Sequence, residues 1–508
     1  MKLQEIIVIA TAGVSAADVI ANTKYGPMRG VQVHDAVNAF LGVRYAQPPL
    51  GDLRFQPPQP LQNYGKEGGY EASSPIKATS LGPSCHQFMY DLPLGSAFKP
   101  STAESEDCLT LNIYVPKGAN YNKPMPVYVW SPGGAYGEGS SSVPVYNPTG
   151  FVAENKDIIV VTWNYRLNIF GFPNSPALEA QNLGLRDQRF ALEWIRDNIR
   201  DFGGDPSRIV LGGQSAGAVS VDAMMYSHPR DPIVSGLILQ SGTVQMAQQM
   251  LNRPLSDVDS EFVRVAKKVG CANDDRKAEL ECMRKVDAQK LKNAISSSKL
   301  NKIGSPYGGM PMVDNKILFT REEYERRGNA GEFALVPTLL GTTKDEGDSV
   351  VSWNANGINK TLSDLITENF FDCNVALESR FRALNKVPVW RYLYKGVFPE
   401  VTLHPWMRAY HAADVPLLMG TYNLLGANRT IASDTTTREA SKFLQDFFGA
   451  FIRSPACGLW DKFRLSEFRP NTATLIELFP ENKPTLAQVM DKENSACLQP
   501  ASIMWDQL

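Results

Sequence analysis

The pentapeptide Gly213-Gln214-Ser215-Ala216-Gly217 is the part of the sequence whose residue types most directly indicate chemistry. It follows an apolar run at 209–211 and precedes residues 218–225, which are compatible with a helix. A turn this tight between a strand and a helix requires glycine at 213 and 217, because side chains there would clash, and it lifts Ser215 Oγ above the sheet edge. The N–H of Ala216 then points toward a developing oxyanion. The pattern predicts a nucleophile elbow with an activated serine.

A second glycine-rich loop, Ser131-Pro132-Gly133-Gly134-Ala135-Tyr136-Gly137, follows the apolar stretch 126–130. The consecutive glycines Gly133 and Gly134 allow two backbone N–H groups to approach one oxygen, as an oxyanion hole requires. An ordinary turn could have the same composition, so the loop alone leaves both interpretations open.

An activated serine needs a histidine as base and a carboxylate to orient it, and α/β-hydrolases supply them in the chain order serine, acid, histidine. Of the five histidines in the sequence, this order favours His404 and His411, which lie far downstream of the serine. The acid should follow a buried strand, and the apolar stretch 335–343 leads to both Asp345 and Glu346. The residues alone leave both pairs of alternatives open.

The elements that must position these residues are predicted by hydrophobic periodicity. Apolar stripes at 190–199 and 440–452 indicate helices, the second ended by Pro455, and short runs at 31–33 and 40–43 indicate antiparallel strands. Other apolar runs are rich in β-branched residues and do not alternate, as expected of strands buried on both faces of a sheet. The sequence predicts an α/β fold, a large and mostly parallel central sheet with helices on both faces. The non-alternating runs are 127–130, 158–163, 209–211, 237–239 and 336–340.

The overall charge and the spacing of possible metal ligands exclude several classes of function. The chain has 508 residues, with 51 Lys and Arg against 53 Asp and Glu, a net charge of -2 and no long run of one sign. We therefore expect no nucleic-acid partner. The sequence contains no CxxC, HxxxH or HExxH pair, so we expect no metal site, and the predicted chemistry needs no cofactor.

The start of the chain resembles a targeting segment. Met1-Lys2 precedes an apolar stretch, 6–17, which includes the small-residue motif Val14-Ser15-Ala16. A membrane span needs about 20 apolar residues, so this stretch is too short to cross a bilayer. It is typical of a secretory signal peptide, with a buried first strand as the alternative. Since no repeat or linker divides the remainder, we expect a signal peptide over 1–17 and one domain over 18–508.

Two longer motifs surround the candidate residues. The stretches Phe202-Gly203-Gly204-Asp205-Pro206-Ser207-Arg208-Ile209-Val210-Leu211-Gly212-Gly213-Gln214-Ser215-Ala216-Gly217 and Glu106-Asp107-Cys108-Leu109-Thr110-Leu111-Asn112 fit the two signatures of the type-B carboxylesterase/lipase family, which contains the cholinesterases. The chain resembles this family from Tyr25 to Cys497, nearly the whole mature length. The resemblance implies the α/β-hydrolase fold and hydrolysis of carboxylic esters through an acyl-enzyme.

The resemblance also resolves the open alternatives. It places the acid on Glu346 rather than Asp345 and the base on His411 rather than His404, with Ser215 as the nucleophile. It further places the oxyanion donors on the backbone N–H groups of Gly133, Gly134 and Ala216.

Supporting contacts around the triad are implied in the same way. An ion pair between Arg44 and Glu106 would brace the site, and Ser241 would support the side chain of Glu346.

The sequence departs from the family's pattern at three positions. Pro132 replaces the first glycine of the oxyanion loop and so removes one backbone donor. Gln214 stands where the animal enzymes usually carry glutamate. Phe98 stands where cholinesterases place the tryptophan that stacks on a quaternary ammonium group. Because a phenyl ring holds a cation less well than indole does, choline esters are not the expected substrate.

Seven cysteines suit an oxidising compartment, in which most should form disulfides. Two of the expected bridges close short loops, and the third follows from the resemblance, which leaves Cys457 without a partner. Sequons at Asn359 and Asn428 indicate up to two glycans on a secreted chain. The expected bridges join Cys85 to Cys108, Cys271 to Cys282 and Cys373 to Cys497.

The predicted function is that of a secreted serine carboxylic ester hydrolase acting on a small-molecule or lipid ester. We expect short to medium acyl chains, because Pro93 and Pro100 deny the segment between Cys85 and Cys108 the long amphipathic helix of a lipase lid. A triacylglycerol lipase on the same fold is the first alternative. A non-catalytic cholinesterase-like binding protein is the second, although such proteins typically lose the serine that is retained here.

Overall fold

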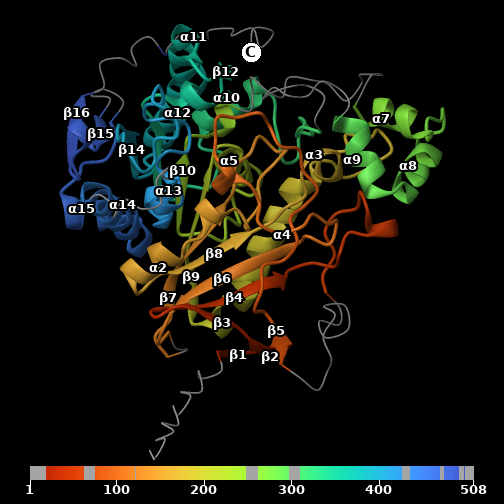
Figure 1. The fold of residues 1–508 in the computed structure, drawn as a ribbon, viewed down its shortest axis with the longest axis horizontal. Coiled ribbons are helices and arrows are strands. Elements are labelled where there is room, and N and C mark those ends of the chain that lie inside the picture. Colours follow the sequence, from red (N-terminus) through yellow and green to blue (C-terminus); the bar gives the residue numbers. More distant parts are fainter. Residues whose placement is uncertain are drawn as a thin grey trace, which may run out of the picture.

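The computed structural model describes residues 19–61, 75–119, 122–246, 261–296, 309–425, 435–469, 474–490 and 497. The expected signal peptide over 1–17 and the sequon at Asn428 lie outside these residues. An eleven-stranded sheet forms the centre of the molecule, with the strand order β16-β15-β14-β11-β10-β9-β7-β8-β6-β4-β3 (Figure 1).

The middle of this sheet is parallel, as the non-alternating apolar runs predict. All residues of β8, β10 and β11 are buried, because helices cover the sheet on both sides. The parallel strands are β7 (Met125–Ser131), β8 (Ile159–Trp163), β9 (Gly204–Gln214), β10 (Gly236–Gln240), β11 (Thr338–Thr343), β14 (Val389–Tyr394) and β15 (Thr474–Leu478).

Antiparallel strands complete the sheet at both edges. The N-terminal strands β3 (Val31–His34) and β4 (Val37–Arg44) confirm the expectation for this region, and β6 (Thr110–Pro116) joins them to β8. At the other edge, β16 (Leu486–Met490) pairs with β15. Two smaller sheets contain β1 (Ile20–Thr23), β2 (Gly26–Arg29) and β5 (Ile76–Lys77), and β12 (Trp353–Asn354) and β13 (Gly357–Ile358).

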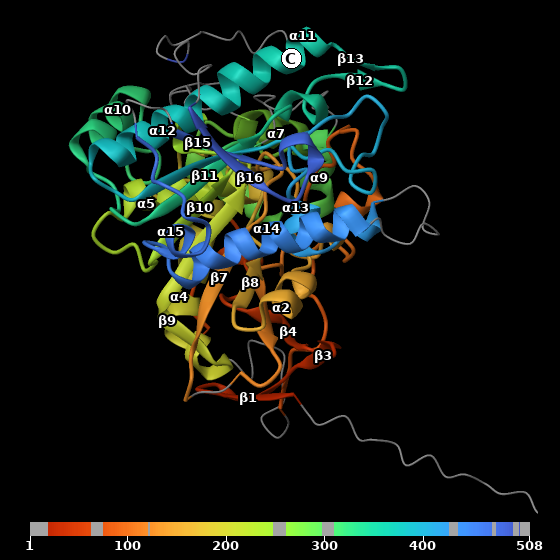
Figure 2. The same cartoon turned by 90° about the vertical axis from the view of Figure 1, so that its left-hand side faces the viewer.

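The sheet separates two hydrophobic cores. Along β7, Val127 and Val129 point into one core while Tyr128 and Trp130 point into the other, as the alternation of a strand requires. The first core is covered by α4 (Leu183–Asn198), α5 (Ala216–Ser227) and α12 (Cys373–Leu384). The second is covered by α2 (Thr149–Asn155), α13 (Val415–Met419) and α14 (Thr435–Arg453), which runs across that face in Figure 2. The helices α4 and α14 coincide with the two predicted helical stripes.

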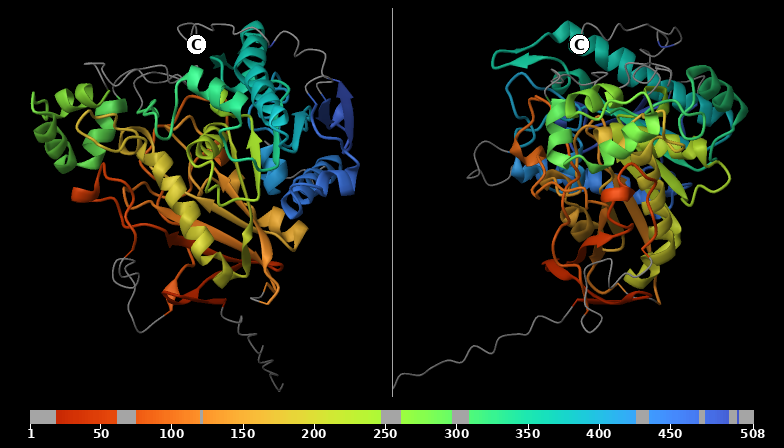
Figure 3. Two further views of the ribbon diagram at one scale, coloured as in Figure 1. Left: turned by 180° about the vertical axis from the view of Figure 1, so that it is seen from behind. Right: turned by 90° about the vertical axis from the view of Figure 1, so that its right-hand side faces the viewer.

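A smaller core lies at one end of the molecule, where three short helices pack together (Figures 1 and 3). These are α7 (Glu261–Val269), α8 (Arg276–Lys285) and α9 (Ala288–Ser296). Among the described residues, no helix is both long and apolar enough to cross a membrane. The other α-helices of the described residues are α3 (Asn168–Gly171), α10 (Arg321–Ala330), α11 (Lys360–Ile366) and α15 (Gly458–Phe463).

Candidate active site

Ser215 occupies the sharp turn between the last residue of β9 and the first residue of α5, with φ 56° and ψ -127°. A Cβ atom on Gly213 would lie 2.5 Å from the carbonyl carbon of Gly217, and one on Gly217 would lie 2.2 Å from the carbonyl oxygen of Ser131. Both positions therefore require glycine. The backbone N–H of Ser215 donates to the carbonyl of Gln240 at 2.8 Å, which ties the turn to the end of β10.

The predicted oxyanion loop lies beside this serine. A Cβ atom on Gly133 would lie 2.9 Å from Ser215 Cβ, so the backbone of the loop can approach the nucleophile only because residue 133 is glycine. Gly134, at φ 117°, accepts hydrogen bonds through its carbonyl from the N–H groups of Gly137 and Glu138, both at 3.0 Å. These two hydrogen bonds close the turn of the loop on itself.

The candidate base and acid are in direct contact. His411 Nδ1 lies 2.6 Å from Glu346 Oε2, and Glu346 is completely buried at the start of the turn that follows β11. The other carboxylate oxygen of Glu346 accepts the backbone N–H of Thr343 at 2.8 Å. A carboxylate at Nδ1 holds that nitrogen protonated and leaves Nε2 with the lone pair that a general base needs.

The two rejected alternatives lie in other environments. Asp345 forms an ion pair with Arg408 at 2.7 Å, and His404 stacks on Trp406 with ring centroids 5.1 Å apart. Neither residue lines the cavity that contains Ser215. The structure thus brings together the residues that the family resemblance selected, which periodicity could not distinguish from their neighbours.

Gln214 makes a contact that the sequence did not predict. Its Nε2 lies 3.0 Å from His411 Nε2, so the amide donates to the same nitrogen that would take the proton of Ser215. Within the described part of the chain, this amide is the hydrogen-bond partner of His411 Nε2, and Ser215 Oγ is not. Hydrogen bonds between a nucleophile and its base are often long before substrate binds.

Two supporting contacts differ from the expectation. Glu106 pairs with Arg54, at 2.5 Å, while Arg44 pairs with Asp107, at 2.6 Å, so the expected pairing of Arg44 with Glu106 was assigned to the wrong partners. Two adjacent acidic residues meet two arginines here, and sequence spacing does not distinguish the possible combinations.

Ser241 does not support Glu346 through a hydrogen bond. Its Oγ is buried, and it has no hydrogen-bond partner among the described residues. The support comes instead from the backbone of Thr343, which could not have been recognised by residue type.

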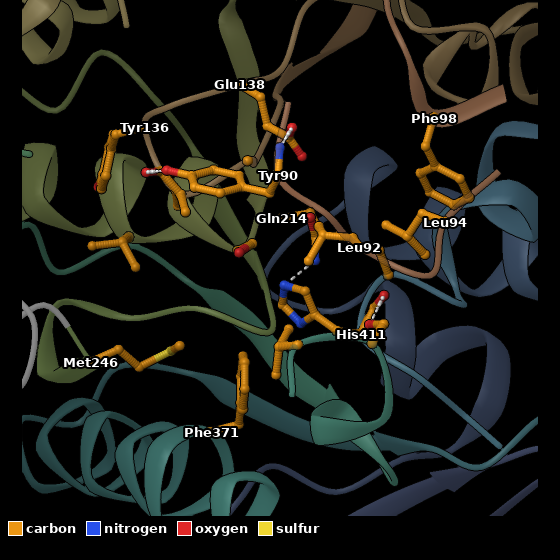
Figure 4. A pocket seen from close by; sticks show the side chains of 18 of the residues that line it. Tyr90, Leu92, Leu94, Phe98, Tyr136, Glu138, Gln214, Met246, Phe371 and His411 are labelled. Atoms are coloured by element: carbon orange, nitrogen blue, oxygen red, sulfur yellow. Dashed lines mark hydrogen bonds between the residues drawn. The ribbon is translucent and has the colours of Figure 1, made fainter. Parts of the chain in front are cut away.

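A cavity of about 100 Å³ opens between these groups (Figure 4). Ser215, Ala216, Gly134 and His411 line it, together with aromatic and aliphatic side chains. Phe371 lies against the imidazole of His411, with ring centroids 4.9 Å apart. The apolar part of the wall includes Leu92, Leu94, Phe98, Val219, Met246, Val350, Ile366, Phe370 and Phe371.

The segment between Cys85 and Cys108 forms one rim of the cavity. Within this fully described segment, the only helix is the short 3-10 turn η2 (Ser96–Phe98), so no amphipathic helical lid is present. Four hydrogen bonds attach the segment to the oxyanion loop and to the two residues that follow it, and one of them runs from Tyr90 O–H to Ala135 C=O (3.5 Å). The other three run from Phe88 N–H to Gly137 C=O (2.9 Å), from Tyr90 N–H to Glu138 Oε2 (2.8 Å) and from Gly139 N–H to Gln87 Oε1 (3.0 Å).

Glu138 is the residue of the cavity that sequence reasoning missed. Its carboxyl faces a mostly apolar space, and burial raises the pKa of Glu138 to about 7. The sequence did contain a signal for Glu138, since it is an acidic residue beside the glycine-rich loop that follows β7. Loops of this kind lie beside the substrate.

The structure contains the three expected disulfides, and Cys457 is exposed and unpaired. The Cα atoms of the bridged pairs are 5.1 Å apart for Cys85 and Cys108, 5.5 Å for Cys271 and Cys282 and 4.9 Å for Cys373 and Cys497.

Comparison with known proteins shows the family to which the chain belongs. The profile of the Carboxylesterase family matches residues 17–360. Chlorogenic acid esterase of Aspergillus niger is 36% identical over 456 residues, which cover 88% of this chain and 85% of that protein. Secreted lipase 5 of Gibberella zeae is 33% identical over 501 residues, covering 91% and 90%, and cholinesterase of Mus musculus is 34% identical over 371 residues, covering 70% and 58%. The chain therefore belongs to the carboxylesterase family and is a carboxylic ester hydrolase with the α/β-hydrolase fold.

Proposed function

We propose that this protein is a secreted serine carboxylesterase that hydrolyses dissolved esters of short to medium acyl chain length. The observation that carries the proposal is the 2.6 Å contact between His411 Nδ1 and Glu346 Oε2 at a cavity that Ser215 also lines. A buried carboxylate behind a histidine, next to a serine on a strained turn, is the arrangement that activates a hydroxyl for attack on a carbonyl.

The reaction has two steps. His411 Nε2 takes the proton of Ser215 as Oγ attacks the ester carbonyl, and the backbone N–H groups of Gly133, Gly134 and Ala216 stabilise the oxyanion. The imidazolium then gives its proton to the departing alcohol, which leaves an acyl-enzyme. Water, deprotonated by the same histidine, attacks that acyl group and releases the acid. No cofactor takes part in these steps.

The preference for dissolved, shorter esters rests on the rim of the cavity. The segment between Cys85 and Cys108 is irregular and is attached to the oxyanion loop, so it offers no helix that could swing open at an oil surface. A second candidate, triacylglycerol lipase, is favoured by the apolar wall and by the relative named as a secreted lipase.

Secretion is supported by the three disulfides and by the apolar N-terminal stretch, which we propose is a signal peptide over 1–17, followed by one domain over 18–508. We also propose that Asn359 and Asn428 carry glycans. Asn359 is exposed at the start of α11, where its side-chain oxygen accepts the N–H of Leu362 at 3.1 Å.

A fluorophosphonate probe tests the proposed chemistry, because it reacts only with an activated serine. We expect stoichiometric labelling of the wild-type protein and none of Ser215→Ala. A series of p-nitrophenyl esters should then show the highest kcat/KM for short to medium chains. Faster hydrolysis of emulsified long-chain triglyceride, with a sharp rise at the onset of the emulsion, would instead identify the protein as a lipase.

A further inference from the structure

Glu138 places a carboxyl group in the wall of the cavity that contains Ser215. It belongs to the turn of the oxyanion loop, and its Cγ would lie 3.1 Å from a Cβ atom on Gly134. The side chain therefore passes close to the expected oxyanion donors. In Figure 4 its carboxyl lies above the ring of Tyr90, on the same side of the cavity as Tyr136.

The carboxyl of Glu138 is only partly satisfied by the protein. Oε2 accepts the N–H of Tyr90 at 2.8 Å. In the described part of the chain Glu138 forms no ion pair, and Oε1 has no hydrogen bond; Lys99 is exposed and acts on the carboxyl only through its charge. Oε1 therefore keeps a free acceptor position at the wall of the cavity, and carboxyl groups with a raised pKa beside a cavity are frequent at functional sites.

We propose that Glu138 Oε1 binds a hydroxyl group of the substrate, so that the pocket selects esters with a hydroxyl on the acyl or the alcohol part. This inference rests on the proposed esterase function and adds a substrate class to it. The rings of Tyr90, Phe98, Tyr136 and Tyr146 also line the cavity, which favours a hydroxyl carried by an aromatic ring.

A hydroxyl suits this site better than a cation does. A hydroxyl can donate to the carboxylate and can also accept from the neutral acid, so it binds in both protonation states. A cation needs the ionised form, and both charges would then be removed from water, which is costly. Phe98 also provides a weaker cation-binding surface than an indole ring would.

The pH dependence of the selectivity follows from the protonation of Glu138. Burial raises the pKa of Glu138 to about 7, and an ionised acceptor forms a hydrogen bond roughly twice as strong as a neutral one. The preference for a hydroxylated ester should therefore increase as the pH rises through about 7. The titratable groups that face Glu138 are Tyr90, Tyr136, Tyr146, the more distant Lys99 and, across the cavity, His411. Protonation of His411 affects both members of a substrate pair and cancels in their ratio.

The test uses two matched pairs of esters. One pair is methyl phenylpropanoate and its para-hydroxy derivative, and the other is phenylethyl acetate and its para-hydroxy derivative. The measured quantity is the ratio of kcat/KM for the hydroxylated ester to that for the plain ester, below and above neutral pH. For the wild-type protein we expect a ratio of roughly 10 or more in at least one pair, as a hydrogen bond to a charged group provides.

Three variants test whether the carboxyl of Glu138 causes this ratio of kcat/KM values. Glu138→Met should bring the ratio to about one, because it removes both oxygens at similar volume. Glu138→Gln should keep part of the ratio and lose its pH dependence. Asp91→Asn removes an exposed negative charge from the same rim segment, outside the cavity, and should keep the wild-type ratio and its pH dependence.

The outcomes distinguish this inference from the proposed function. Equal ratios in the wild-type protein and Glu138→Met, or a stronger preference for the para-aminomethyl esters, would overturn the hydroxyl site while the esterase stands. A wild-type protein that neither reacts with fluorophosphonate nor hydrolyses any of the esters would overturn the proposed function itself. If thermal unfolding shows that Glu138→Met does not fold, Glu138→Gln provides the test. A Glu138→Gln ratio that still changes with pH as the wild-type ratio does would overturn the hydroxyl site.

Discussion

The identity of the base is the first point to test at the scale of single residues. We expect Ser215→Ala and His411→Ala each to lower kcat by several orders of magnitude, because members of a triad act as a unit. His404→Ala should retain most of the activity, since His404 stacks on Trp406 away from the cavity. Steady-state kinetics on a p-nitrophenyl ester gives the comparison. Loss of activity in a folded His404→Ala protein, together with an active His411→Ala protein, would show that the assignment is reversed.

Gln214 offers a second residue-scale test, because its amide contacts the nitrogen that must accept a proton. In Gln214→Glu a carboxylate would stand about 3.0 Å from His411 Nε2 and would stabilise the protonated imidazole. The acid limb of the kcat/KM profile should then move to higher pH by roughly one unit, in the direction that an adjacent opposite charge imposes. The matched neutral variant, Gln214→Met, should leave the position of the limb unchanged. An unchanged limb in Gln214→Glu would show that the glutamine contact is absent in the working enzyme.

The sequence identified the nucleophile from its own motif, but it could not choose the acid from periodicity. Asp345 and Glu346 are adjacent, and only the turn after β11 determines that Glu346 faces His411 while Asp345 faces Arg408. The pairing of Arg44 and the role of Ser241 were misjudged for a similar reason. Both depend on side-chain direction, which the order of residues does not contain.

At the scale of the elements, the rim segment closed by Cys85 and Cys108 should affect both stability and activity. Replacing both cysteines with serine should lower the free energy of unfolding by about 3 kcal/mol, as expected for a loop of this length. It should also lower kcat/KM for a short ester, because the segment is hydrogen-bonded to the oxyanion loop. Thermal unfolding and kinetics measure the two effects.

The disulfide between Cys271 and Cys282 provides the control, since it lies in the small core of α7 and α8, away from the cavity. Its removal should lower stability and leave kcat/KM unchanged. An equal loss of kcat/KM in both double variants would mean that the rim segment has no special role.

The strands of the sheet could be predicted because strands buried on both faces have sequences that are unbroken apolar runs. The helices α7 to α9 were not predicted, although Phe262, Val265, Ala266 and Val269 have the spacing of one helical face. Whether such a face packs on the main sheet or forms a core of its own depends on distant residues such as Phe55. Such contacts between residues distant in the chain cannot be recognised from a short stretch of sequence.

For the molecule as a whole, a buried charge network is expected to be a major determinant of stability. Arg382 is completely buried, is paired with Asp222 and lies 3.1 Å from Glu378. Arg382→Met would leave two buried carboxylates without a cation and should reduce the free energy of unfolding at neutral pH by about 3–5 kcal/mol. The loss should shrink at lower pH, because burial and Asp222 already raise the pKa of Glu378 to about 7 and a proton can replace the missing charge.

Urea unfolding at two pH values measures this effect. Arg326→Met is the matched control, because Arg326 pairs with two glutamates on the surface and its removal should hardly move the unfolding midpoint. A loss in Arg382→Met that does not depend on pH would mean that packing, rather than unpaired charge, causes it.

The unpaired Cys457 has a practical consequence for handling the protein on a solid support. It lies just after Pro455, whose Cβ would be 2.7 Å from a Cβ atom on Gly236, the first residue of β10. Ser215 instead follows the last residue of β9, which is parallel to β10, so it lies at the opposite end of these strands from Gly236. With the other six cysteines in disulfides, a maleimide-coated bead should capture the enzyme through one thiol and in one orientation, with the substrate cavity facing the liquid.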